Sequence, residues 1–142
     1  MSSYYSNPTE NMAIRAVEQE LERARRTYDF AVLDIHAEAT SEKLALAHWF
    51  DGRVRVMFGT HTHVQTADEQ ILPGGTGYVT DLGMCGGADG VMGISSDVIL
   101  KRYLTGLPEK FTPAEGPIVC DGVIFTVDDV SGKTLSTQRV RF

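Results

Sequence analysis

The sequence lacks several features that would place it in a familiar class. No apolar run approaches the roughly 18 residues that a membrane-spanning helix needs, and the first residues contain neither the basic nor the apolar segment of a secretory signal. No long basic run offsets the formal net charge of −6, which argues against a non-specific binder of duplex nucleic acid. We therefore expect a cytoplasmic protein with no membrane and no duplex nucleic acid among its partners.

Cysteine is scarce as well. The two cysteines, Cys85 and Cys120, stand far apart in the sequence and do not form a CxxC pair. This spacing leaves a disulfide open but favours two free, partly buried thiols in a reducing compartment. Because no basic residue stands beside Cys85 to activate its thiol, we do not assign it as a nucleophile.

What is present is typical of one globular domain. The chain has 142 residues, enough to bury a core, with 42% hydrophobic and 23% charged residues. Internal repeats, low-complexity linkers and a convincing domain boundary are all missing from the sequence. We expect residues 1–7 to be a flexible end and residues 8–142 to form a single domain.

Apolar spacing and capping residues predict three helices. The first would start at Asn7-Pro8 and carry an apolar stripe (Ala13, Val17, Leu21, Ala24) to about Thr27. The second would span residues 40–50 and end at Asp51-Gly52, with Trp49 in the core and His48 as a partly buried packing residue. The third would start at Ser95 or Ser96 and end at Pro108, with an apolar face formed by Val98, Ile99, Tyr103 and Leu104.

Strand-forming segments lie between and after these helices. A buried strand is predicted at residues 30–35, and a strand of alternating charged and apolar residues at 53–58. Short strands are predicted at residues 69–72 and 77–81. Residues 118–127 and 134–142 are predicted to form a hairpin that turns at Ser131-Gly132. The order of elements favours an α/β domain in which a sheet packs on a sheet and helices lie outside.

Three of the four histidines, His36, His61 and His63, stand at the ends of predicted strands, where α/β folds place their functional loops. His61 and His63 are two residues apart, a spacing that sends both side chains to the same side of an extended chain. Neutral imidazole is the commonest nitrogen ligand of zinc, manganese and iron ions. With Asp34 and Glu38 flanking His36, the pattern favours a metal site over unrelated surface histidines.

Other residues near this pattern receive no metal role. Asp34 lies within a predicted strand and Glu38 lies just past His36, so neither is assigned as a ligand. Asp81 follows a predicted strand, where it either faces the site or caps a turn. The glycine-rich segment 83–93 lacks the Lys-Ser/Thr ending of a P-loop, and we expect it to be an irregular loop.

Two longer stretches of the sequence resemble a known protein family. Residues 33–43 (LDIHAEATSEK) and 59–68 (GTHTHVQTAD) resemble the YmdB-like family of bacterial metallophosphoesterases. Further similarity lies at residues 71–76 (ILPGGT), at residues 80–84 (TDLGM) and in the helix that follows Gly93. The resemblance runs from about Asn7 to Phe142 and so covers nearly the whole chain.

The resemblance implies a calcineurin-like, layered α/β/β/α sandwich, of which this chain would be the C-terminal half. It also implies a dinuclear site, usually of iron or manganese, that hydrolyses phosphodiesters such as 2′,3′- and 3′,5′-cyclic nucleotides. His36 and His61 would bind one metal and His63 the other. Two ions of this kind clamp the phosphate and activate a bridging water. Thr60 and Thr62 would orient the rings or the phosphate oxygens, or would simply be exposed loop residues.

The departure from the family is equally informative. The first half of the family pattern carries an aspartate motif, a Glu-Asn pair and an Asn-His motif that supplies a ligand and the general acid, and this sequence has none of them. No catalytic acid is therefore assigned. The leading function is a metal-dependent phosphodiesterase. The alternatives are an incomplete half-domain, which forms a homo-oligomer or pairs with a chain supplying the N-terminal ligands, and one metal ion bound for structure.

Overall fold

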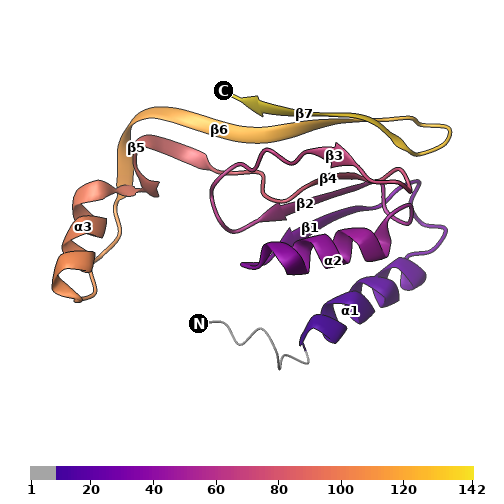
Figure 1. Cartoon of the computed structure of the whole chain (residues 1–142), viewed down its shortest axis with the longest axis horizontal. Coiled ribbons are helices and arrows are strands. Elements are labelled where there is room, and N and C mark those ends of the chain that lie inside the picture. The colour runs from indigo at the N-terminus through magenta and orange to yellow at the C-terminus, as the bar shows by residue number, and fades with distance from the viewer. Residues whose placement is uncertain (1–8) are drawn as a thin grey trace.

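The computed structural model describes residues 9–142, and Figure 1 shows their arrangement. Within these residues the chain forms three helices, α1 (Thr9–Arg23), α2 (Thr40–Phe50) and α3 (Ser96–Thr105). It also forms seven strands: β1 (Val32–His36), β2 (Val56–Thr60), β3 (Gln70–Ile71), β4 (Gly77–Val79), β5 (Cys85–Ser95), β6 (Pro113–Val127) and β7 (Thr134–Arg141). No helix in this part of the chain is long and apolar enough to cross a bilayer. The predicted flexible end at residues 1–7 and the helix start at Asn7-Pro8 lie outside it.

The strands form two sheets. The first has the order β1-β2-β4-β3, with β1, β2 and β4 parallel and β3 antiparallel to β4. The second is antiparallel with the order β5-β6-β7. In Figure 1, α1 and α2 lie on one side of the four-stranded sheet and β6 and β7 lie on the other, so the layers run α, β, β. The predicted mixed α/β class with sheet on sheet is confirmed.

The core lies between α2 and the four-stranded sheet. Leu46, Ala47 and Phe50 of α2 are buried, at the spacing that keeps side chains on one face of a helix. They cluster with Ile35, Met57 and other sheet residues. Ala13, Val17 and Leu21 of the predicted stripe pack against this cluster together with Ile14. Ala24 lies outside α1, which ends at Arg23 rather than near Thr27.

The prediction was wrong for two residues of α2. Trp49 is 54% exposed rather than in the core, and His48 is exposed rather than partly buried. Both positions are rotated away from the buried face, because successive residues of a helix turn by about 100°. Trp49 instead donates from Nε1 to Glu18 Oε1 of α1 over 3.1 Å, so it joins the two helices at their outer surface.

The prediction was also wrong for the glycine-rich segment. Residues 85–95 form the strand β5 rather than an irregular loop, and β6 begins at Pro113 rather than at Ile118. A Cβ on Gly87 would lie 2.3 Å from the carbonyl oxygen of Ala114. Glycine here therefore permits a close approach of the two strands, which accounts for the composition that resembled a loop.

Helix α3 lies at one end of the molecule, beyond the three layers (Figure 1). It ends at Thr105 rather than at Pro108, because the next residue, Gly106, takes a left-handed backbone (φ 69°) and donates its N–H to the carbonyl of Arg102. The predicted apolar face is not buried: Tyr103 and Leu104 are 84% and 85% exposed. No residue of α3 is buried, and Val98 and Ile99 on the predicted apolar face are only half-buried.

Candidate metal centre

The parallel pairing of β1 and β2 sets the geometry of the histidines. Its register places Ile35 beside Gly59 and His36 beside Thr60, at the carboxyl ends of both strands. His61 follows Thr60 directly and so reaches the same edge. His36 Nε2 and His61 Nδ1 lie 3.1 Å apart, with the two rings nearly perpendicular at 87°.

A chain of hydrogen bonds favours one tautomer of a neutral His36 ring. The Thr60 hydroxyl donates its one proton to Asp34 Oδ1 over 3.0 Å. Thr60 Oγ1 also lies 3.0 Å from His36 Nδ1, so the hydroxyl oxygen accepts the N–H group of the His36 ring. A neutral imidazole carries one N–H, and this network therefore leaves His36 Nε2 as a bare lone pair.

The other ring is held in the same way. His61 Nε2 lies 2.7 Å from Glu38 Oε2, an atom that only accepts when ionised, so the N–H of His61 points toward Glu38. His61 Nδ1 is then the bare nitrogen of its ring, and it faces the bare nitrogen of His36. Two lone pairs at 3.1 Å repel each other unless a cation or a proton lies between them.

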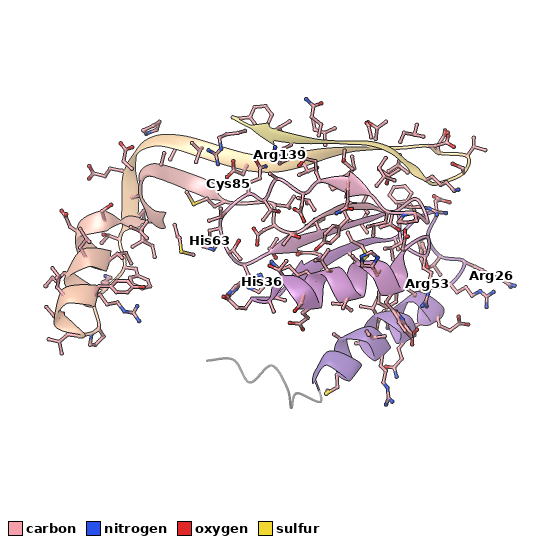
Figure 2. The ribbon with its side chains drawn as sticks, in the orientation of Figure 1. Arg26, His36, Arg53, His63, Cys85 and Arg139 are labelled. Atoms are coloured by element: carbon pink, nitrogen blue, oxygen red, sulfur yellow. The ribbon has the colours of Figure 1, made fainter. Side chains whose placement is uncertain are left out.

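His63 lines the same cavity as His36 and His61 but has a different hydrogen-bond partner. Its Nδ1 lies 3.3 Å from the carbonyl oxygen of Met92 in β5, which leaves Nε2 as the acceptor nitrogen. His36, His61 and His63 line a cavity of about 530 Å³ together with Cys85 and other residues of β5 and β6. Figure 2 shows His36, His63 and Cys85 in the region between α3 and the four-stranded sheet. Across residues 9–142, no group of three or more His, Cys, Asp or Glu side chains is arranged so that it could hold a metal ion.

The histidine loop has a strained backbone. His61 and His63 have positive φ angles of 113° and 62°, a region that side chains other than glycine rarely occupy. The strand before them needs Gly59, because a Cβ there would lie 1.8 Å from the carbonyl oxygen of Thr80. Glycine therefore allows β2 to approach the end of β4, and does not itself turn the chain.

A buried ion pair between α2 and the loop after β4 holds the histidine loop in place. Lys43 Nζ and Asp81 Oδ2 lie 3.0 Å apart, and both side chains are fully buried. Asp81 also accepts the backbone N–H groups of Thr62 and Gly83 over 3.0 Å each. The Asp81 carboxylate thus ties the backbone between the two histidines to α2 and to the loop after β4.

The charge of Asp81 is favoured despite its burial. Burial raises the pKa of Asp81, but the N–H groups of Gly83 and Thr62 and the Lys43 ammonium lower the pKa by more, so the net shift is downward. Asp81 therefore stays ionised at neutral pH.

Sequence reasoning placed some of these residues and missed others. Thr60 contacts the His36 ring, whereas the hydroxyl of Thr62 contacts Val64 instead. Asp34 and Glu38 lie behind the rings as hydrogen-bond acceptors. Lys43 received no role, although its position three and four residues before Leu46 and Ala47 marks it as part of the buried face of α2.

Comparisons with known proteins agree with this architecture. The chain is 47% identical over 133 residues to a 2′,3′-cyclic-nucleotide 2′-phosphodiesterase of Bacillus subtilis, covering 94% of this chain and 50% of that protein. A crystal structure of a phosphatase from Mycoplasma pneumoniae superposes with a TM-score of 0.84 at 36% identity, covering 96% of this chain and 47% of that one. A hypothetical protein from Thermus thermophilus superposes with a TM-score of 0.83 at 38% identity, covering 91% of this chain and 50% of that one.

The chain thus spans about half the length of the relatives it matches. The family pattern of the YmdB-like proteins, in contrast, matches residues 1–140, nearly the whole of this chain. The match includes both histidine-bearing segments, and the structural neighbours share the fold at more than one third identity. This chain belongs to the YmdB-like protein family.

Proposed function

We propose that this chain is the histidine-bearing half of a metal-dependent phosphodiesterase site. The observation that carries the proposal is the pair of bare nitrogens, His36 Nε2 and His61 Nδ1, that face each other at 3.1 Å. Both rings have their N–H group committed to an oxygen acceptor behind them, which is the usual arrangement of metal-binding histidines.

The spacing of the two nitrogens fits a shared ion. Nitrogens that bind one metal at about 2.0–2.1 Å, at angles between about 90° and 110°, lie about 2.9–3.4 Å apart. The distance of 3.1 Å falls within this range. Imidazole is a suitable ligand for iron or manganese, and we propose that His36 and His61 bind one such ion and that His63 binds a second through Nε2.

The roles of the protein groups follow from their contacts. Asp34 and Thr60 hold the His36 ring in one orientation, and Glu38 holds the His61 ring. Asp81 and Lys43 hold the strained backbone between His61 and His63. When bound, the metal ions would supply positive charge for the phosphate oxygens and acidity for an attacking water.

Cyclic nucleotides are the proposed substrates. One relative is named as a 2′,3′-cyclic-nucleotide 2′-phosphodiesterase. The cavity of about 530 Å³ beside the histidines falls in the range of small-molecule sites, about 300–1,000 Å³. The α, β, β layers fit three layers of a calcineurin-like α/β/β/α sandwich, and we propose that fold for the complete domain.

Metal binding tests this proposal directly. The purified chain is dialysed against Mn(II) or Fe(II), and bound metal per chain is measured together with hydrolysis of 2′,3′-cyclic AMP. We expect His61→Ala to lose the metal. His48→Ala should retain it, since His48 is exposed on α2 and makes a matched control. If the unsubstituted chain binds neither ion, the proposal is wrong.

A second candidate is a half-domain that becomes active only in an assembly. β1 is an edge strand of its sheet, and Val32 on it is 52% exposed. Beside it lies an apolar groove of about 410 Å³, lined by α1 residues such as Val17 and Leu21 and by Leu33. An unpaired strand edge and an apolar groove favour contact with another chain, either a second copy or a chain that supplies the missing carboxylate ligands.

Mass determination in solution separates these cases. Metal binding with hydrolysis by a homo-oligomer would favour a site completed between copies. Metal binding without hydrolysis would favour a separate complementing chain, and addition of the N-terminal half of a family member should then restore hydrolysis.

A further inference from the structure

The two cysteines that the sequence separates are neighbours in the second sheet. Cys85 of β5 and Cys120 of β6 are direct partners in the strand register. Their sulfur atoms lie 2.7 Å apart, both thiols are free, and both residues are exposed. Neither thiol has a part in the proposed metal chemistry.

The backbone around the pair suits a covalent bond between the sulfurs. Cys120 exchanges both of its backbone hydrogen bonds with Phe142 beyond β7, at 3.0 Å each, so its N–H and C=O point away from Cys85. Cys85 and Cys120 are therefore a non-hydrogen-bonded pair of an antiparallel ladder. Such pairs bring the two Cα atoms to about 4.5 Å, and a disulfide accepts Cα separations of about 4.4–6.8 Å.

We propose that Cys85 and Cys120 form a reversible redox site that closes to a disulfide in the wall of the histidine cavity. Cys85 lines that cavity with His36, His61 and His63, and Figure 2 shows Cys85 close to His63. The bond would close a loop that contains all of α3 and also Met92, whose carbonyl holds the His63 ring. Oxidation would thus fix the segment that forms one side of the cavity.

The oxidant is a small-molecule disulfide such as oxidised glutathione. One cysteine thiolate attacks a sulfur of the reagent, the reagent's S–S bond breaks, and one glutathione thiolate leaves as a mixed disulfide forms on the protein. The second cysteine thiolate then attacks the protein sulfur of the mixed disulfide and releases the second glutathione. The two protons of the cysteines end on the two glutathione thiols, so two protein electrons reduce one oxidised glutathione.

The test uses the full chain, first reduced and then incubated with oxidised glutathione. The incubation lasts hours, because the hydrogen bond with Cys85 and the nearby charge of Asp121 raise the pKa of the Cys120 thiol and reduce the fraction of thiolate. We expect the intact mass to fall by two hydrogens, a Cys85–Cys120 crosslinked peptide, and a Tm higher by several degrees that dithiothreitol reverses.

Cys120→Ser is the matched control, and it should give one glutathione adduct per chain and no rise in Tm. Two glutathione adducts on one chain, a disulfide between chains, or two thiols that still react with iodoacetamide would each overturn the proposal. None of these readouts depends on metal binding or on phosphodiesterase activity.

Discussion

Two parts of the molecule each contain a helix with apolar side chains, but only one of the two helices buries them. We call α1, α2 and the four-stranded sheet the body, and residues 86–119, between the two cysteines, the arm. In the body, α2 buries Leu46, Ala47 and Phe50 against the sheet. In the arm, α3 has apolar residues at helical spacing but none of them is buried. Apolar periodicity thus predicts which face of a helix is apolar, and does not predict whether this chain supplies a partner for it.

The same contrast explains the construction of the histidine cavity. His36 and His61 are held by the body through parallel strands and the Lys43–Asp81 pair. His63 contacts the arm through the carbonyl of Met92. A site that combines a packed scaffold with a less buried segment can keep two histidines fixed while its opposite wall changes position.

The largest difference should come from truncating one apolar residue in each region. Phe50→Ala removes a fully buried ring from the body and should cost about 3–5 kcal/mol of unfolding free energy. Leu104→Ala changes a side chain that is 85% exposed and should change stability by less than about 0.5 kcal/mol. Urea denaturation of both variants checks this. Equal losses would mean that the arm is packed in solution, for example in an oligomer.

The next effect concerns the buried ion pair of the body. Asp81→Asn leaves the buried Lys43 ammonium without its counter-charge and should destabilise the chain by about 3 kcal/mol. Because Asp81 also holds the backbone of Thr62, the variant should weaken the metal binding that we propose as well. The same urea and metal measurements check both effects.

Two controls accompany this variant. The double variant Lys43→Met/Asp81→Asn removes both charges and should recover most of the lost stability. Glu20→Gln breaks an exposed ion pair with Arg23 and should change stability by less than about 0.5 kcal/mol. A double variant no more stable than Asp81→Asn would show that the carboxylate acts through the backbone N–H groups alone.

Much of the body could be predicted from the sequence. The bounds of α2 at residues 40–50 and the two strands that end near His36 and His61 follow from local patterns, and so does the final hairpin, which lies outside the body. The ion pair could not be predicted, because Lys43 and Asp81 are distant in sequence and only the packing of α2 on the sheet brings them together. In the arm, glycines that permit close strand pairing were mistaken for loop residues, since composition does not distinguish the two roles.

Acid should act on the body through its carboxylates. Burial raises the pKa of Asp68, but hydrogen bonds from Thr66 and Thr80 lower it by more, and the pKa of Asp81 is also lowered. A carboxyl with a lowered folded pKa contributes stability above its unfolded pKa of about 3.9, and loses it as the pH falls through the folded value. We expect stability to decline below about pH 4, measured by circular dichroism, and Asp68→Asn to make that decline shallower. If stability declines with acid equally in Asp68→Asn and in the unsubstituted chain, Asp68 does not contribute to the loss of stability.

The smallest effect should be confined to the arm. Gly106 ends α3 with a φ of 69° and has no neighbour within 4 Å of where a Cβ would stand, so Gly106→Ala adds backbone strain without a clash. A left-handed alanine costs about 1 kcal/mol. Because no residue of α3 is buried, the helix end should fray while the body stays folded. Hydrogen exchange of the backbone amide at position 106 should then be about fivefold faster, while the Tm stays unchanged. Gly122→Ala, where a Cβ meets only Val140 at 3.7 Å, is the matched control. A fall in Tm for Gly106→Ala alone would show that the end of α3 supports the whole fold, and that body and arm unfold as one unit.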